Sequence, residues 1–162
     1  PATQRLRMVH SLAEACGARG MVGGQVLDLQ ATGQLLSAKA LETMYQKKTG
    51  TLLRACVRLG AVPAQPDPKV LEDLEQYAAA IGLAFQVQDD VLDVEWVTGK
   101  IGKPQCSDQA LQKPTFVSLF GLREAKQELQ RLHQKAHQSL TNLDSRADPL
   151  REIADFIVQR DH

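Results

Sequence analysis

The sequence predicts an all-α fold in a single domain over residues 1–162, on three observations. Apolar residues make up 43% of the chain but aromatic ones only 4%, so the core must consist of Leu, Val, Ile and Ala, a bias that favours helices. Apolar positions recur at helical spacing, and the alternation typical of strands is absent from the sequence. The length is enough for one domain with a real core.

The first two helices are predicted on either side of a glycine-rich stretch. Four glycines lie between positions 17 and 24, either as a loop or as small residues that let two helices pack closely. We expect the second helix to resume by about Met21 and to run to about Thr32, through Gln25 and Asp28. The first helix is indicated by an apolar face near the start of the chain: Leu6, Val9, Leu12, Ala13 and Cys16.

A long helix is predicted from the N-cap Ser37 up to Gly60, a residue type that commonly ends helices. This helix runs through the tripeptide Lys48-Thr49-Gly50. A glycine inside a helix costs about 1 kcal/mol relative to alanine. We therefore expect a kink, or the close approach of another segment, at Lys48 and Thr49.

The second half of the chain is predicted to hold the remaining helices. Asp67 and Pro68 form a helix start, an N-cap followed by proline at the first helical position, and Asp148 and Pro149 repeat that pattern. Pro114 can begin another helix in the same way. The expected helices span about 69–95, 114–120, 123–142 and 149–160, and a loop covers 99–108.

The charge balance and the cysteine content exclude several classes of protein. Nineteen basic residues offset nineteen acidic ones, so the chain has no electrostatic footprint for nucleic acid or for an anionic membrane surface. No apolar run approaches the roughly 20 residues of a membrane span. The three widely spaced cysteines fit neither a disulfide framework nor a zinc motif, which makes a reducing cytoplasm the default location.

The stretch from Ile81 to Val94 is the most informative part of the sequence. It is apolar on nearly every face, which is typical of a buried helix, yet Asp89, Asp90 and Asp93 lie within five positions. At these spacings the carboxylates are neighbours on a helix and repel one another. Burying them as charges is costly, so cations must compensate them or the helix must border a wet cavity.

Magnesium is the cation that this pattern indicates. It typically binds one or two carboxylates and completes its shell with water and with phosphate oxygens of a substrate. Asp-Asp-x-x-Asp on a helix that lines a cavity supplies such a partial shell. On the motif alone, a solvated helix end that merely carries acidic residues explains the pattern about equally well.

Lysines elsewhere in the chain favour the interpretation as a metal–diphosphate site. Lys48 lies at the expected kink, Lys100 and Lys103 lie in the loop after the acidic helix, and Lys113 precedes the next helix. A diphosphate that a metal bridges to carboxylates needs such basic groups on its remaining oxygens.

Several segments of the chain match one known pattern, in one order along nearly its whole length. They are Gly20-Met-Val-Gly-Gly-Gln-Val-Leu-Asp-Leu29, Lys48-Thr-Gly-Thr-Leu-Leu-Arg-Ala-Cys-Val-Arg-Leu-Gly60, Gly82-Leu-Ala-Phe-Gln-Val-Gln-Asp-Asp-Val-Leu-Asp-Val94, residues 98–115 and Ile157-Val-Gln-Arg160. Together they resemble the trans-prenyl diphosphate synthase family, of the bacterial farnesyl diphosphate synthase type. The resemblance implies an antiparallel bundle of long helices around a deep cavity, a homodimer, magnesium dependence and a cytoplasmic location.

The resemblance also implies a reaction: head-to-tail condensation of isopentenyl diphosphate with an allylic diphosphate (dimethylallyl or geranyl) to farnesyl diphosphate or a similar short-chain product. Carried over by position, Asp89, Asp90 and Asp93 would bind Mg²⁺, and Lys48, Thr49 and Asp89 would take part in catalysis. The substrate-binding residues would be Gln25, Lys48, Thr49, Gln86, Lys103 and Lys113, with Asp28 lining the same cavity.

Some features depart from the family pattern. Cys106 stands where the family usually has glycine, and Trp96 and Pro104 are unusual for the substrate loop. The family's first aspartate-rich motif and its upstream basic residues have no counterpart. We therefore expect the N-terminal half of the family's chain to be missing and the 162 residues alone to be inactive; product length stays open.

Two other interpretations compete with the transferase. A terpene cyclase shares the fold and the magnesium–diphosphate chemistry, but its second metal motif, with Asn and Ser or Thr before a Glu, is not found. A non-catalytic helical subunit that packs against an active synthase would suit the missing first motif and Cys106. Separately, His133 and His137 lie four apart, a spacing that can bind metal; with no third ligand in sight, we interpret them as a solvated helix face.

Overall fold

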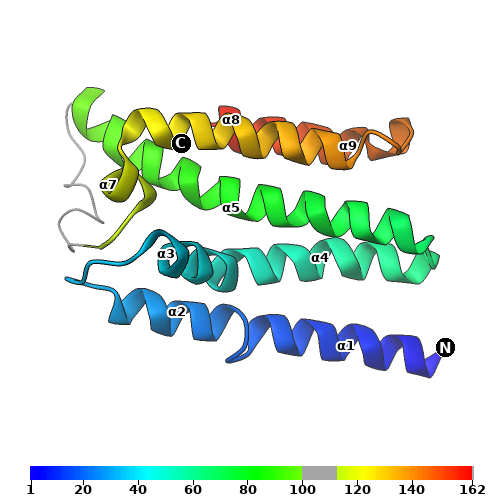
Figure 1. Cartoon of the computed structure of the whole chain (residues 1–162). Coiled ribbons are helices and arrows are strands. Elements are labelled where there is room, and N and C mark those ends of the chain that lie inside the picture. Colours follow the sequence, from blue (N-terminus) through cyan, green and yellow to red (C-terminus); the bar gives the residue numbers. More distant parts are fainter. Residues whose placement is uncertain (100–112, 162) are drawn as a thin grey trace.

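The computed structural model describes residues 1–99 and 113–161, without the side chains of 96–99, and every regular element in these ranges is helical (Figure 1). The predicted all-α class is thereby confirmed. In chain order the elements are α1 (Ala2–Cys16), α2 (Met21–Gln30), α3 (Ala38–Tyr45), η1 (Gln46–Gly50), α4 (Thr51–Ala61), η2 (Val62–Ala64), α5 (Pro68–Gly99), α7 (Phe116–Phe120), α8 (Leu122–Ser139), η3 (Ser145–Ala147) and α9 (Asp148–Gln159).

The 32-residue helix α5 lies at the centre of the molecule (Figure 1). Helix α4 and the turn η1 pack on one side of it and helices α8 and α9 on the other, while α1 and α2 form the outer edge beyond α4. The N-terminus and the connection between α8 and α9 lie at one end of the molecule. The last turns of α5, which carry the acidic residues, lie at the opposite end with α7.

Within residues 1–99 and 113–161, buried side chains form two core groups. The larger one surrounds α5, where Tyr77 and Val87 are fully buried, and extends to Leu132 of α8 and Ala154 of α9. The smaller one, at the ends of α2 and α3, consists of Ala31, Leu41, Met44 and Tyr45. Full burial of an aliphatic side chain stabilises the folded state by about 1.5–3 kcal/mol. Because other helices pack on both sides of α5, this helix is apolar on nearly every face.

Tyr77 also ties the central helix to the end of the chain. Its hydroxyl donates a hydrogen bond to the carbonyl oxygen of Leu150 at 2.6 Å. Burial raises the pKa of Tyr77 to about 12, so the phenol stays protonated and keeps this bond at any ordinary pH. Helix α9 is thereby fixed against α5 at its first turns.

A π-helical turn, η1 (Gln46–Gly50), interrupts the long predicted helix and divides it into α3 and α4. A Cβ on Gly24 of α2 would lie 2.2 Å from the backbone nitrogen of Lys48, so only glycine lets α2 approach this turn. A Cβ on Gly82 of α5 would lie 3.0 Å from Cα of Gly50, so α5 also comes close. The close approach predicted at Lys48 is confirmed.

The helix boundaries around α3 and α4 are partly as predicted. Ser37 is the N-cap of α3, and its hydroxyl accepts a hydrogen bond from the amide of Ala40 at 3.3 Å. Gly60 does not end a helix, because α4 continues through it into the 3₁₀ turn η2. The left-handed residue that ends this segment is Gln65, with φ of 50°.

Helix starts and ends in the second half also differ in detail from the prediction. Helix α5 begins at Pro68 as predicted but runs on to Gly99, which was expected to begin a loop. Pro114 does not open α7: Thr115 is its N-cap and exchanges hydrogen bonds with Ser118 in a capping box. The hydroxyl of Thr115 can accept a hydrogen bond from a free backbone amide in the first turn of the helix, whereas the side chain of Pro114 has no hydrogen-bonding atom.

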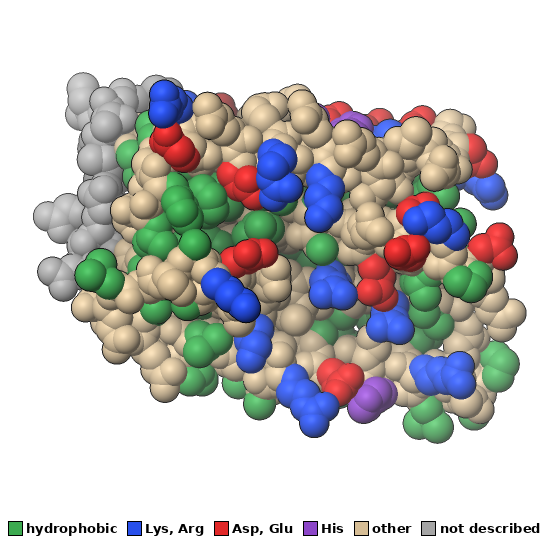
Figure 2. Space-filling model, in the orientation of Figure 1, with side chains coloured by type: hydrophobic (Ala, Val, Ile, Leu, Met, Phe, Trp, Pro, Cys, Tyr) green, Lys and Arg blue, Asp and Glu red, His purple; other side chains and the backbone are tan. Residues whose placement is uncertain are grey.

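The apolar face predicted for the first helix is largely uncovered. Leu6 and Val9 of α1 are 70% and 66% exposed, and Leu29 of α2 is 63% exposed. We call these three residues the α1–α2 stripe; α1 and α2 form the lower edge of the view in Figure 2, where apolar side chains lie among charged ones. Exposed apolar side chains on neighbouring helices are typical of surfaces on which another segment or molecule packs. No described helix has the length and apolar character needed to cross a membrane.

Candidate active site

Asp89 lies near the surface of α5, with 43% of its side chain exposed. One carboxylate oxygen accepts a hydrogen bond from the Gln86 amide at 3.1 Å, and the other forms an ion pair with the guanidinium of Arg160. Because Gln86 lies one turn earlier, the helix itself positions the amide beside the carboxylate. Asp89 is therefore both oriented and accessible to solvent.

Asp90, the next residue along α5, is buried, with an exposed fraction of 6%. One oxygen of its carboxylate accepts hydrogen bonds from the hydroxyl of Tyr45 and from the backbone amide of Phe116, both at 2.6 Å. Hydrogen bonds to a charged acceptor are about twice as strong as neutral ones. This carboxylate thus joins the end of α3 and the start of α7 to the central helix, and its predicted contact with magnesium stays a prediction.

Asp93 is partly exposed and lies four residues after Asp89 on α5. Side chains four residues apart share one face of a helix. Two carboxylates on one face, of which that of Asp89 reaches solvent, leave room for water and phosphate oxygens, the remaining ligands that magnesium prefers. The donor atoms present therefore fit this ion at Asp89 and Asp93.

Arg160 belongs to the matching segment Ile157–Arg160, but the sequence analysis assigned it no role in the site. Its guanidinium lies 4.2 Å from the centre of the Phe85 ring and also donates to the Phe85 carbonyl oxygen at 3.2 Å. The Gln88 amide in turn donates to the carbonyl oxygen of Arg160 at 2.9 Å. These contacts hold Arg160, the residue after α9, along α5, and its guanidinium places a positive charge beside the Asp89 carboxylate.

Lys48 and Lys113, both predicted substrate ligands, converge on a single carboxylate. Their ammonium groups lie 3.0 and 2.9 Å from the same oxygen of Asp28, which is buried in α2. Burial by itself raises the pKa of Asp28, but the hydrogen bonds and positive charges of Lys113 and Lys48 outweigh it and hold that pKa below its usual range. The group is a lysine pair held by one carboxylate, with a net charge of one positive unit.

The lysine pair is connected to the acidic helix through Asp90. Tyr45 and Phe116, which both donate hydrogen bonds to Asp90, each lie three residues from one of the lysines, Lys48 and Lys113. Three residues span at most about 10 Å of chain, so Asp90 fixes both lysines near the end of α5 that carries Asp89. Figure 2 shows basic and acidic side chains side by side next to an apolar area on this face.

The other predicted site residues differ in what the structure shows of them. Gln25 is exposed on α2, one turn before Asp28, and Thr49 is partly buried in η1 beside Lys48. Lys103 lies outside the described residues, as do Lys100 and Cys106. The described part of the predicted substrate site is therefore the lysine pair, Gln25, Thr49 and Gln86.

The fold and these charged groups define a class of protein: the all-helical proteins in which an aspartate-rich helix lies near a pair of lysines. The family model described as polyprenyl synthetase matches residues 2–151, and the chain belongs to this family. The resemblance read from the sequence motifs is thereby confirmed.

Individual relatives agree with the family assignment. Farnesyl diphosphate synthase of Escherichia coli (strain K12) is 46% identical over 96% of this chain and 54% of that protein. The crystal structure of a putative farnesyl-diphosphate synthase from Marinomonas sp. MED121 superposes with a TM-score of 0.84 at 34% identity, over 98% of this chain and 54% of that one. A geranyltransferase from Helicobacter pylori, complexed with magnesium and isoprenyl diphosphate, has a TM-score of 0.75 at 26% identity, over 98% and 52%. The chain spans about half the length of the relatives it matches.

Proposed function

We propose that this chain forms the magnesium- and diphosphate-binding wall of a prenyltransferase. The reaction is the head-to-tail condensation of isopentenyl diphosphate with an allylic diphosphate, dimethylallyl or geranyl, to give farnesyl diphosphate or a similar short-chain product. One observation carries the proposal: Asp90 ties the lysine pair of Lys48 and Lys113 to the helix that presents Asp89 to solvent. In a metal-bridged diphosphate, the two lysines would contact the phosphate oxygens, and the exposed carboxylates of α5 would contact the metal ion.

The chemistry that these residues supply is electrostatic. As the bond between the allyl group and its diphosphate breaks, negative charge grows on the departing phosphate oxygens, and the ammonium groups of Lys48 and Lys113 stabilise it. Asp89 and Asp93 would hold Mg²⁺, which when bound neutralises the same charge. The hydroxyl of Thr49 lies next to Lys48 in η1, where its oxygen helps to stabilise the allylic cation.

The apolar surroundings contribute by excluding water. The buried side chains of α5, the helix that carries the carboxylates, and of α8 form an apolar environment, and a carbocation formed beside them is protected from hydrolysis. The double bond of isopentenyl diphosphate then attacks the cation, and a proton is lost. In this proposal the complete enzyme contains further helices and is a cytoplasmic homodimer. The exposed α1–α2 stripe is the surface on which such helices or a second protomer would pack.

A non-catalytic helical subunit is the second candidate. The ion pair between Arg160 and Asp89 favours it, because a guanidinium already compensates the carboxylate that would bind the metal. In that role the chain would pack against an active synthase and regulate it without turning over substrate itself.

A chimera decides between the two. The N-terminal half of the E. coli farnesyl diphosphate synthase, the part that this chain does not match, is joined to residues 1–162, and incorporation of labelled isopentenyl diphosphate is measured with dimethylallyl diphosphate and Mg²⁺. We expect the chimera to be active, the 162 residues alone to be inactive, and Asp89→Ala to lower turnover of the chimera by orders of magnitude with an unchanged circular dichroism spectrum.

The matched control is Glu95→Gln, a carboxylate six positions further along α5 that pairs with Lys126 at the surface. This variant removes one negative charge from the same helix and is expected to keep its activity. Full activity of the Asp89→Ala chimera would leave the acidic helix with a structural role only. A folded chimera without activity would favour the non-catalytic subunit.

A further inference from the structure

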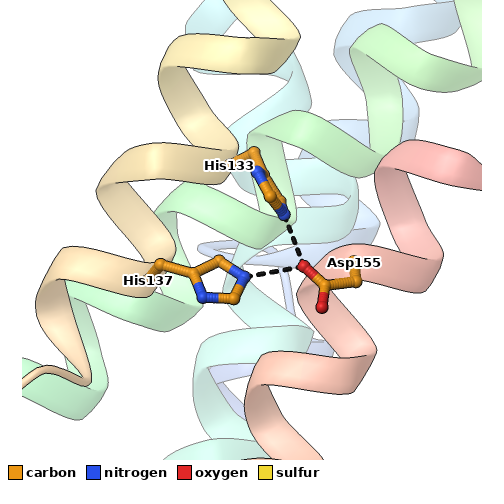
Figure 3. Close-up of side chains that lie close together, drawn as sticks. All are labelled: His133, His137 and Asp155. Carbon is orange, nitrogen blue, oxygen red and sulfur yellow. Dashed lines mark hydrogen bonds and ion pairs between the residues drawn. The ribbon is translucent and has the colours of Figure 1, made fainter.

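Helices α8 and α9 bring two histidines and an aspartate together on the side of the molecule away from α1 (Figure 3). The Nε2 atoms of His133 and His137 lie 2.6 and 2.7 Å from the same carboxylate oxygen of Asp155. One donor atom from each of the three residues lies within 4.8 Å of the others. We call these three residues the His–His–Asp cluster.

The sequence alone led to the opposite interpretation of these histidines. Their spacing of four placed both rings on one face of a helix, as the structure confirms, but no third ligand was visible nearby. Asp155 lies 18 residues after His137 along the chain, and the antiparallel packing of α8 against α9 brings it opposite both rings. The reason for that interpretation, the lack of a third ligand, does not hold in the structure, because the third group comes from the neighbouring helix.

The donor atoms of the cluster determine which ions it can bind. Two imidazole nitrogens and one carboxylate oxygen suit zinc, cobalt, nickel and copper, whereas magnesium and calcium prefer oxygen ligands alone. A tetrahedral ion with metal–ligand distances of about 2.0–2.1 Å needs donor atoms about 3.3 Å apart. Each Nε2 atom must therefore move about 0.6 Å further from Oδ1, and the ion takes the place of the two hydrogen bonds that now join these atoms.

The side chains have the freedom to make this adjustment. The exposed fractions are 24% for His133, 34% for His137 and 41% for Asp155, so each side chain borders solvent. The backbones of α8 and α9 need not move, because both helices are held in place by buried side chains such as Leu132 and Ala154. Solvent access also leaves the fourth coordination position to water.

We propose that the His–His–Asp cluster binds one divalent first-row transition metal ion, with Zn²⁺ as the natural occupant. The ion is coordinated by His133, His137, Asp155 and a water molecule, and it clamps α9 onto α8. Arg160, which contacts Asp89, follows Asp155 by five residues on the same segment. The clamp therefore also stabilises the segment that covers the acidic helix, and it is separate from the magnesium ligands in both position and donor type.

The test is titration of the metal-free protein with Co²⁺ and Zn²⁺ in excess Mg²⁺, which occupies oxygen-only sites. Visible absorption of Co²⁺ reports its coordination, and calorimetry with Zn²⁺ gives the stoichiometry. We expect one equivalent to bind, and His133→Gln, His137→Gln and Asp155→Asn each to weaken binding by about tenfold or more, because even the loss of an outer-shell partner typically costs about 10–100-fold in metal affinity. His10→Gln, an exposed histidine on α1 beside Glu14, is the matched control and binds as the wild type does.

A second measurement separates metal binding from the hydrogen bonds of the empty cluster. Zn²⁺ is expected to raise the unfolding temperature of the wild type but not of His137→Gln, while the two proteins unfold at similar temperatures in EDTA. Co²⁺ or Zn²⁺ binding that survives in all three cluster variants overturns the proposal, and its loss in Cys56→Ser would assign it to that exposed thiol. Absence of binding by the wild type also overturns it.

Discussion

Removal of the Asp90 carboxylate tests how the candidate active site is held together. Asp90→Ala deletes the acceptor that the hydroxyl of Tyr45 and the amide of Phe116 share, each at 2.6 Å. All three groups lie at or near the junction of α3, α5 and α7, and the carboxylate is 6% exposed. Water therefore cannot replace the lost oxygen without opening this junction.

The expected loss follows from those two bonds. A hydrogen bond to a charged group is worth about 1.5–3 kcal/mol, so the pair corresponds to about 3–6 kcal/mol of the free energy of unfolding. The total free energy of unfolding of a protein of this size is about 5–15 kcal/mol. For a chain of this length, each kcal/mol lost from the free energy of unfolding lowers the midpoint of thermal unfolding by about 2–4 °C. The midpoint of Asp90→Ala should therefore lie at least about 6 °C below that of the wild type.

Urea denaturation without magnesium measures this loss. Tyr45→Phe, which removes one donor and keeps the buried ring, should cost about 1.5 kcal/mol, and the double variant should cost less than the sum because no hydroxyl is left unpaired. Asp93→Ala on the same helix is the control and should stay within about 0.5 kcal/mol of the wild type. A loss below about 1 kcal/mol for Asp90→Ala, or a loss only when magnesium is present, would refute the reasoning and favour a metal-ligand role.

Three further predictions concern the surrounding contacts. Gly24→Ala should destabilise the protein by about 2 kcal/mol or more in urea denaturation, since its Cβ would lie 2.2 Å from a backbone nitrogen, whereas Gly60→Ala, which meets nothing within 4 Å, should be neutral or stabilising by up to about 1 kcal/mol; equal effects would contradict the close packing. For Asp28→Asn, the stability advantage of the wild type should be present above about pH 4 and disappear as the pH falls through the lowered pKa of Asp28; an advantage that grows in acid would reverse the sign of that shift. Arg160→Met should strengthen Mg²⁺ binding, measured by calorimetry, because the guanidinium no longer competes for Asp89; unchanged affinity would show that the two cations do not compete.

Local sequence signals predicted most of the fold. Ser37 caps a helix and Pro68 begins one, since capping and proline geometry depend on a few adjacent residues. Gly60 misled the prediction because glycine permits a left-handed end but does not require one. The apolar face of α1 was predicted correctly as a face, but whether it is buried depends on what packs on it, and Leu6 is 70% exposed.

The same distinction holds for the candidate site. The spacing of Asp89 and Asp93 placed both carboxylates on one face of a helix, because backbone geometry makes every α-helix repeat every 3.6 residues. Which carboxylate faces solvent was not encoded locally: Asp90 is buried only because the ends of α3 and α7 meet there. Sequence alone gave the types of charged groups and their order along the chain.

The tertiary structure alone decided the partners of those groups. Lys48 and Lys113 are 65 positions apart, yet both contact Asp28, and Asp155 meets two histidines that no local pattern connects to it. The physical reason is that capping, periodicity and composition act over a few residues, whereas ion pairs and metal ligands depend on distances in space. The sequence by itself therefore determined an all-helical chain with an acidic helix and suitable lysines, and the packing of α2, α5, α7, α8 and α9 determined which of those charges meet.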